Sequence, residues 1–410
     1  MKRLKQYLLG LFAVVLLGAV AFFGIVPRWF DRNNNTVAQA PPYVAAEAAR
    51  QVHDSLFVAD LHADQLLWAR NPLRRAGQGH VDVPRLIEGN VALQVFSAVT
   101  KAPKGLNYES NAADSDMITP LVIAQLWPMQ TWTSLKQRAL YQAEKLHDAA
   151  RRSDGRLTVV QTKADLEQYL ARREQDSNVV AGLLAIEGLH PLEGDFTNLD
   201  ALIDAGYRMM GLTHFFDNEV AGSAHGLEKG GLTDLGRRVV RRMEERQILI
   251  DLAHLAPRAI DEVLAMATRP VVVSHTGVQG TCAGARNLSD RHIQAIADKG
   301  GVIGIGYWDG AICEVRLASI VRAIRYVADH VGVEHVALGS DFDGTTHTVF
   351  DTTGLVLLTE ALLADGFNEE EVALIMGGNV LRLLKETLPD DIENKDDLMF
   401  GGKSEEFGRI

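Results

Sequence analysis

Residues 248–254, ILIDLAH, and residues 270–275, PVVVSH, are two short apolar stretches that each end in a histidine. Continuous Val and Ile runs of this length are typical of parallel β-strands buried on both faces. Strands are therefore predicted at 248–253 and 270–274, and six similar runs occur at 56–61, 91–99, 179–186, 209–213, 302–305 and 336–339. Helical patterns separate the runs, so the sequence predicts an α/β fold, a (β/α)8 TIM barrel.

The chain has 410 residues, of which 47% are apolar, and this is enough for one large core. We expect a single barrel domain at 44–388. Its longest insertion, 100–163, lies between the second and third predicted strands, and its last helix is predicted at 369–388. Residues 389–410 form a charged tail to which we assign no role.

The first 30 residues differ in character from the rest of the chain. A basic N-terminus precedes an uncharged run at 8–26, which as a helix would span about 28 Å, close to a hydrocarbon core of about 30 Å. We therefore predict an N-terminal membrane-anchor helix, a transmembrane signal anchor at 1–30, followed by a polar linker at 31–43. The triplet Ala38-Gln39-Ala40 leaves signal-peptide cleavage as the alternative.

The charges around this run predict its orientation. Lys2, Arg3 and Lys5 outnumber the basic residues that follow the run closely. Positive charge favours the cytoplasmic side, so the barrel domain is expected on the extracytoplasmic side, periplasmic or extracellular.

Strand after strand is followed by a residue that can bind a metal or move a proton. In chain order these are His62 with Asp64, Glu187, His214, His254, His275 and Asp341. The C-terminal ends of all strands of a parallel barrel meet at one rim, so these side chains should converge there. His62 and Asp64 are two residues apart in an extended segment, so both point the same way and can hold one cation.

Mixed imidazole and carboxylate ligands favour zinc, with other divalent transition metals as alternatives. Five candidate ligands exceed what one catalytic zinc needs, so we predict two Zn²⁺ ions. The predicted ligands are His62, Asp64, Glu187, His254 and His275. Glu187 is the expected bridge, and a metal-bridged hydroxide the expected nucleophile.

Three further residues are expected to act beside the metals. Asp341 would be the general acid and base; Asp343 is the alternative, unless it serves only in a turn. His214 would stabilise an oxyanion, or else be a structural imidazole. Arg286 would bind a substrate carboxylate through two hydrogen bonds, or else be solvated.

Cys282 and Cys313 are the only cysteines of the chain. In an oxidising compartment they would pair, and otherwise both would be buried free thiols. The residues alone leave both alternatives open.

In this order the motifs resemble the membrane dipeptidases, the renal-dipeptidase-like family of the metal-dependent amidohydrolase superfamily. The matching segments are DLHAD at 60–64, IEG at 186–188, LTH at 212–214, DLAH at 251–254, SHT at 274–276, Cys282 with Arg286-Asn287, GSDFDG at 339–344 and GN at 378–379. Each motif is modest alone, but the ordered set, over roughly 56–388, is specific.

The resemblance implies a binuclear zinc metallopeptidase that cleaves dipeptides. His62 and Asp64 match the ligands of one zinc, His254 and His275 those of the other, and Glu187 matches the bridge.

By the same comparison, Asp341 matches the acid/base carboxylate. His214 matches the contact to the scissile carbonyl, and Arg286 the contact to the free carboxylate of the substrate. The resemblance also implies a disulfide between Cys282 and Cys313.

Two departures from the family concern specificity and anchoring. Many relatives carry Asn where this chain has Ala63, which affects the surroundings of Asp64. The tail at 389–410 lacks the hydrophobic run needed for a C-terminal lipid anchor, and the N-terminal helix would replace it.

We therefore predict zinc-dependent hydrolysis of dipeptides, with Asp341 as general acid/base. One alternative is another amidohydrolase-type reaction on the same barrel, but the enzymes that catalyse such reactions usually have His-x-His as their first motif. The other alternative is a metal-binding, non-catalytic scaffold, which would not need Asp341. The predicted partners are small dipeptide substrates with a free C-terminus and, through the N-terminal helix, the membrane. Whether the protein forms a homodimer is left open. A net charge of −12 without a basic stripe predicts no nucleic-acid partner.

Overall fold

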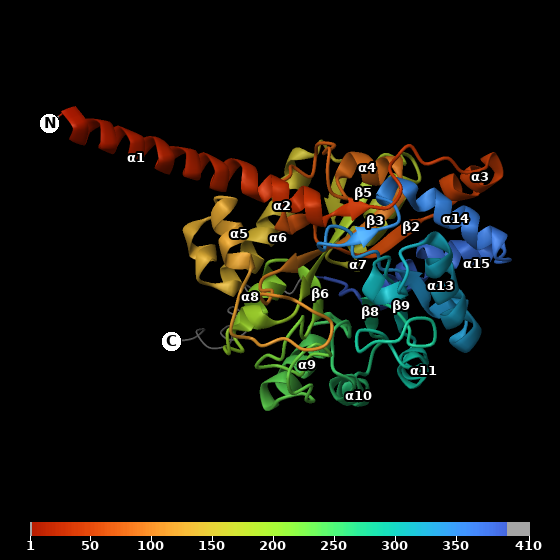
Figure 1. The fold of residues 1–410 in the computed structure, drawn as a ribbon. Helices are drawn as coiled ribbons and strands as arrows, with labels where there is room; N and C mark the ends of the chain where they lie inside the picture. Colours follow the sequence, from red (N-terminus) through yellow and green to blue (C-terminus); the bar gives the residue numbers. More distant parts are fainter. Residues whose placement is uncertain (1, 392–410) are drawn as a thin grey trace, which may run out of the picture.

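The computed structural model describes residues 2–391, and the predicted (β/α)8 barrel is present and closed. Its wall consists of parallel strands (Figure 1): β2 (Val58–Ala63), β3 (Val91–Val99), β5 (Val180–Glu187), β6 (Tyr207–Gly211), β7 (Leu249–Asp251), β8 (Val272–Thr276), β9 (Val302–Ile305) and β10 (Val336–Leu338). Each strand pairs with the next in this order, and β10 pairs with β2 to close the ring. Every one of these strands overlaps a run predicted from the sequence.

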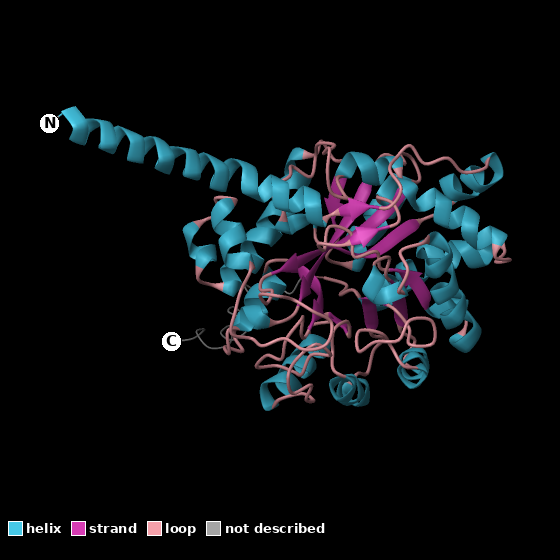
Figure 2. Cartoon of the chain, in the orientation of Figure 1, coloured by secondary structure: helices cyan, strands magenta, loops and turns pink. Residues whose placement is uncertain are grey.

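Helices cover the outside of the barrel (Figure 2). They are α3 (Glu47–Ser55), α4 (Val83–Glu88), α6 (Leu135–Arg152), α7 (Lys163–Arg173), α8 (Asn198–Asp204), α9 (Asp234–Glu245), α10 (Pro257–Met266), α11 (Asp290–Asp298), α12 (Asp309–Ile312), α13 (Leu317–Val331), α14 (Leu355–Ala364) and α15 (Glu369–Ala373). Side-chain caps fix where several of them begin: Thr162 and Asp165 form a capping box at α7. Such caps bond the N–H groups that a helix leaves free at its start.

The barrel interior is filled by the inward side chains of the strands. One buried cluster contains Ala59, Leu61, Leu93, Val95, Ala181, Leu183, Ala185, Met209, Leu249, Val272, Val302 and Ala337. The same cluster includes Val380 and Leu383 of α16 (Asn379–Thr387). This apolar filling supports the strands, whose C-terminal ends carry the polar groups of the site.

The last helical region is not the single helix predicted at 369–388. α15 ends at Ala373, a π-helical turn η7 (Leu374–Gly378) follows, and then α16 begins. A Cβ atom at Gly377 would lie 2.0 Å from the backbone oxygen of Phe57, just before β2. A side chain does not fit at this crossing, and Gly377 leaves the helical conformation, with a φ of 171°, so the helix is kinked there.

Three short strands were not predicted. β4 (Leu157–Val159) pairs with the first residues of β5, within the insertion. β1 (Thr36–Val37) pairs with β11 (His347–Thr348), which follows β10. Strands of two or three residues are too short for a hydrophobic period to show in the sequence.

The N-terminal region is one long helix that projects from the domain (Figure 1). It comprises α1 (Lys2–Val20), a π-helical segment η1 (Ala21–Ile25) and α2 (Val26–Asn34). It is the one helix of the described chain that is long and apolar enough to cross a membrane, and none of its most apolar part is buried.

The beginning of the predicted linker is packed rather than extended. α2 continues to Asn34, β1 follows, and the buried Asp31 makes an ion pair of 2.9 Å with Arg70. The polar composition predicted a linker here, but the side chains of Asp31 and Asn35 have partners on the barrel domain. The division into anchor, linker and barrel domain stays a prediction, and the tail after residue 391 lies outside the described residues.

Candidate active site

The residues predicted at the strand ends converge at one rim of the barrel. His62 lies in β2, Glu187 ends β5, His254 follows β7 and His275 lies in β8. Each is at most 6% exposed. Together with Asp64, they lie in or beside a cavity of about 120 Å³ at the C-terminal end of the strands.

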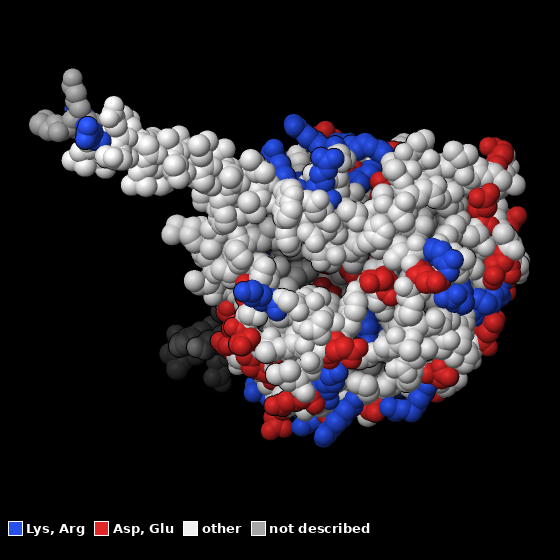
Figure 3. Space-filling model, viewed as in Figure 1, with Lys and Arg blue, Asp and Glu red and all other residues white. Residues whose placement is uncertain are grey.

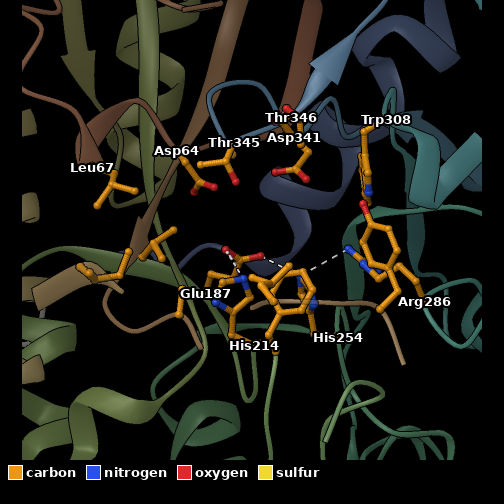
Figure 4. A pocket seen from close by; sticks show the side chains of 17 residues that line it. Asp64, Leu67, Glu187, His214, His254, Arg286, Trp308, Asp341, Thr345 and Thr346 are labelled. Atoms are coloured by element: carbon orange, nitrogen blue, oxygen red, sulfur yellow. Dashed lines mark hydrogen bonds and ion pairs between the residues drawn. The ribbon is translucent and has the colours of Figure 1, made fainter. Parts of the chain in front are cut away.

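Glu187 is the centre of this group (Figure 4). Its Oε1 atom lies 2.8 Å from His254 Nε2, 3.0 Å from His275 Nε2 and 3.8 Å from His62 Nε2. Its Oε2 atom lies 3.2 Å from His214 Nε2. One carboxylate therefore faces four imidazole nitrogens, with two on its Oε1 side at hydrogen-bond distance.

The His62 side of the group is less well bonded. His62 Nε2 lies 3.4 Å from Asp64 Oδ1, and neither atom has a hydrogen-bond partner among the described residues. Asp341 Oδ1 is 4.0 Å from the same nitrogen. Two buried atoms that both carry lone pairs face each other here, and this arrangement fits a shared cation.

The electrostatics of the site also fit divalent cations. Burial and the neighbouring Asp64 carboxylate raise the pKa of Glu187 well above its ordinary value, and burial raises the pKa of Asp341 to about 8. Burial also lowers the pKa of His254 and His275 well below the ordinary value. Neutral imidazoles are the form that binds metals, and a cation offsets the repulsion between buried carboxylates.

A buried serine and aspartate orient the His275 ring. Ser274 Oγ donates to Asp251 Oδ2 at 2.5 Å and lies 2.8 Å from His275 Nδ1. Since the single hydroxyl proton of Ser274 is in the hydrogen bond to Asp251, the contact with His275 must be one in which His275 Nδ1 donates to Ser274 Oγ. The Nε2 lone pair of His275 is then directed at Glu187.

The loop after β10 brings Asp341 into the cavity. Asp341 has a positive φ of 60°, a conformation that non-glycine residues adopt at a cost and that is often found at functional sites. Gly344 follows closely, and a Cβ atom there would lie 2.1 Å from Asp341 Oδ1. The loop therefore needs glycine at this position to keep Asp341 beside Asp64.

Asp343, the alternative acid, is turned away from the cavity. Its side chain is fully buried and makes an ion pair of 2.7 Å with Arg70. It also accepts a hydrogen bond of 2.6 Å from the backbone N–H of His80. Asp343 thus supports the loop, while Asp341 lines the cavity.

Arg286 is buried rather than solvated. It is 5% exposed, and its Nη2 atom donates to the backbone oxygen of His275 at 2.5 Å. Its guanidinium lies over the Trp308 ring, 5.3 Å from the centroid, and it lines the cavity (Figure 4).

The structure also joins Cys282 and Cys313 in a disulfide, with their Cα atoms 5.5 Å apart, and this ties the Arg286 loop to the end of α12.

Sequence reasoning missed several aromatic side chains of the site. Tyr108, Phe215 and Trp308 line the cavity, and His225 lies behind it, with its ring centroid 5.2 Å from that of His254. Trp308 comes three residues after the end of β9, so the rule of strand ends could have found it if aromatic residues had been included. Tyr108 lies in the long insertion, where no pattern marks its position.

Comparison with known proteins identifies relatives of this arrangement. Residues 46–395 match the family model described as membrane dipeptidase (peptidase family M19). The chain is 32% identical to an uncharacterized protein in the pqqA 5' region of Klebsiella pneumoniae, over 57% of this chain and 90% of that protein. It is 27% identical to dipeptidase aclJ of Aspergillus oryzae, over 85% of this chain and 83% of that protein.

A solved structure is similar over most of the chain. A metallo peptidase from Rhodobacter sphaeroides, liganded with a phosphinate mimic of the dipeptide L-Ala-D-Ala, superposes with a TM-score of 0.67 at 27% identity. The match covers 81% of this chain and 99% of that one.

Proposed function

The chain belongs to the membrane dipeptidase family, peptidase family M19, a family of hydrolytic metallopeptidases, and on that premise we propose that it is a zinc-dependent dipeptidase. The observation that supports this most directly is the group around Glu187. Imidazoles from the ends of four strands face its carboxylate, and the buried pair of His62 and Asp64 has atoms without hydrogen-bond partners among the described residues.

We assign His62 and Asp64 to one zinc ion, His254 and His275 to a second, and Glu187 to both. This division is the one that the family resemblance implies, and the distance from His62 to Asp64, which is shorter than that to Glu187, agrees with it. Bound zinc would supply a Lewis acid that polarises the scissile carbonyl and lowers the pKa of water.

Asp341 would exchange the proton. Its side chain is 13% exposed toward the cavity, more than that of Asp64 or Glu187, so water and a leaving amine can reach it. It would take a proton from the attacking water and give one to the amine that leaves.

His214 and Arg286 would hold the substrate. The His214 ring lies within reach of both Glu187 and the cavity, so it can donate to the oxygen that becomes negative in the tetrahedral intermediate. Arg286 is a buried cation at the cavity wall, where a free carboxylate would be its strongest partner.

The N-terminal helix would anchor the protein in a membrane, with the barrel on the extracytoplasmic side. Its length and composition support a span, and the Cys282–Cys313 disulfide agrees with an oxidising compartment.

The test is an assay of the purified full-length protein on L,L and L,D dipeptides, with metal analysis of the same sample. L-Ala-D-Ala is included because the solved relative holds a mimic of it. We expect hydrolysis, two zinc ions per chain, loss of activity after complete chelation and recovery when zinc is returned. Hydrolysis that survives complete removal of metal would show the proposal to be wrong.

A further inference from the structure

The insertion between β3 and β5 contains a stretch of 19 residues without a charged side chain, from Met117 to Leu135. It begins after Asp116 and ends before Lys136. Within it lie α5 (Ile118–Ala124) and the 3-10 turn η3 (Met129–Trp132). We call residues 117–135 the uncharged hairpin. An uncharged segment of this length at the surface of a domain needs a reason.

Several large apolar side chains of the uncharged hairpin face outward. Leu126 is 67% exposed, Met129 is 74% exposed and Met117 is 41% exposed. Leu126 also has a positive φ of 57°, which is rare for a bulky residue. The backbone therefore adopts a costly conformation that presents leucine to the outside, although Gly or Asn would suit this turn better.

The uncharged hairpin lies beside the point where the anchor helix meets the domain (Figure 1). α5 packs against η1 and α2. η1 belongs to the apolar run at 8–26 and occupies roughly its last 8 Å, at 1.5 Å per residue. If that run fills the hydrocarbon core, α5 lies at the depth where acyl chains meet headgroups.

The surface agrees with this position. In Figure 3 the shaft of the projecting helix and the part of the domain just below its base show hardly any charged atoms, whereas Lys and Arg side chains gather on the upper side of the domain where the helix meets it. Acidic and basic residues are mixed on the parts of the domain further from the helix. The stretch also contains Trp132, which is partly exposed, and tryptophan is enriched where proteins meet the membrane interface.

The anchor helix is packed on the domain near the hairpin, so their relative position is set. Phe30 of α2 lies 6.1 Å from the Trp68 ring and packs on a cluster that includes Leu121 and Trp127 of the hairpin. The ion pair between Asp31 and Arg70 holds the adjacent residue of the helix. The domain is therefore not free to swing on a tether.

From these observations we infer that the uncharged hairpin is a second membrane contact, which inserts Leu126 and Met129 into the bilayer at the boundary of headgroups and acyl chains. The inference rests on the proposed membrane span at 8–26, and it goes beyond an anchor that only tethers the enzyme. Ile118, at the start of α5, also lines the active-site cavity, so the membrane contact and the cavity wall form one packed unit.

The experiment uses the full chain in phospholipid vesicles with nitroxide-labelled lipids. The two native cysteines form a disulfide, so an introduced cysteine is the single free thiol for an environment-sensitive fluorophore. Probes are placed at Leu126→Cys and Met129→Cys, with Leu16→Cys inside the span. Val44→Cys is the matched control, because Val44 is 76% exposed and precedes α3, on the opposite side of the domain from α5 (Figure 1).

We expect a blue shift and strong quenching by shallow nitroxides at positions 126 and 129, deep quenching at 16, and neither effect at 44. Quenching at 16 but not at 126 or 129 would overturn the inference and leave the anchor standing. No quenching at 16 would overturn both. Shielding at 126 and 129 that is independent of lipid and rises with protein concentration would assign the surface to a second copy of the chain, against the inference.

A second measurement avoids substitutions. The unaltered protein is reconstituted with a phospholipid that carries a photoreactive diazirine in its acyl chain, and adducts are mapped by mass spectrometry. Adducts at 117–135 as well as in α1 are expected. Adducts confined to α1 would contradict the inference.

Discussion

His275 and His62 both lie beside an aspartate and serine pair, but the two pairs act on different atoms. On the His275 side, Ser274 connects Asp251 to the imidazole ring, since its hydroxyl lies 2.8 Å from His275 Nδ1. The ring is thereby held in one tautomer, with Nε2 directed at Glu187.

On the His62 side, Asp60 accepts a hydrogen bond of 2.9 Å from the backbone N–H of Ser340 and a second one from its hydroxyl. The Ser340 hydroxyl lies 3.1 Å from the backbone oxygen of His62, so this pair fixes the chain and leaves the ring alone. The nearest polar contact of His62 Nδ1 is a long one, 3.5 Å to Ser274.

One half of the site is therefore preorganised at the atoms of its proposed ligands, and the other half only at its backbone. The His275 half already has its nitrogens in place around Glu187. The His62 half has facing lone pairs that a cation would satisfy. Each half also has one neighbour that we do not count as a ligand: Asp341 beside His62 and Arg286 beside His275.

The largest effect is expected from Asp341→Asn. The amide keeps the size of the side chain but cannot accept the proton, so kcat should fall by about 10²- to 10⁴-fold. Both zinc ions should remain, because the His62 half holds its ion through His62, Asp64 and Glu187. Metal analysis and steady-state kinetics on one sample check this. A loss of one ion per chain would show that Asp341 is a ligand, and the ligand set proposed for the ion near His62 would then have to include it.

Arg286→Ala should act through the substrate on the His275 side. A hydrogen bond to a charged group contributes about 1.5–3 kcal/mol, so kcat/KM for free dipeptides should fall by roughly 10- to 100-fold. C-terminally amidated dipeptides should be affected much less. Arg286→Lys is the matched control, which keeps the charge but loses the planar pair of donors. Equal losses on free and amidated substrates would remove Arg286 from carboxylate binding.

Ser274→Ala and Ser340→Ala test the difference between the halves directly. Loss of the group that orients a ligand typically costs about 10- to 100-fold in metal affinity, and we expect this for Ser274→Ala. Ser340→Ala should lower stability by about 1 kcal/mol, the usual value of one hydrogen bond, with a smaller effect on metal affinity. Competition with a chelator and denaturant unfolding measure the two quantities. If both variants lost metal equally, the two halves would not differ as proposed.

The residues that the sequence placed correctly share one property. His62, Glu187, His254 and His275 follow strands with strong apolar runs, and the geometry of a parallel barrel brings all strand ends together. Local pattern and global fold agree at these positions, so the convergence could be predicted without coordinates.

The features that could not be predicted depend on contacts between distant segments. The pairing of β1 with β11 joins residues that are more than 300 positions apart, and neither strand has a hydrophobic period. Asp31 appears in the sequence as part of a polar linker, and only the structure shows its partner Arg70. The opposite roles of Asp341 and Asp343 follow from which side of the loop each faces.

The smallest effect is expected from acidification, and it should appear first in the His62 half. His80 is buried under the loop of Asp341; its Nδ1 atom accepts from the backbone N–H of Asp343 at 2.9 Å, and its Nε2 atom lies 3.0 Å from the backbone oxygen of Thr36. The ring therefore donates through Nε2 and must be neutral at Nδ1, because a proton there would face the N–H of Asp343. Burial lowers the pKa of His80 below its ordinary value of 6.5.

The unfolded chain takes up this proton near pH 6.5 while the folded chain does not, so the contribution of His80 to stability is present above pH 6.5 and declines as the pH falls below it. The free energy of unfolding cannot change through His80 by more than about 1.4 kcal/mol per pH unit, the value for one proton. His80→Gln is the matched variant, since Gln can donate to Thr36 and accept from Asp343 but cannot be protonated. The protection factors of the amides at 341–346, which compare the observed exchange with the intrinsic rate at each pH, should fall between pH 7 and pH 5 in the native protein and stay flatter in the variant. If the protection factors of both fell alike, the acid sensitivity of this loop would have to come from the site itself.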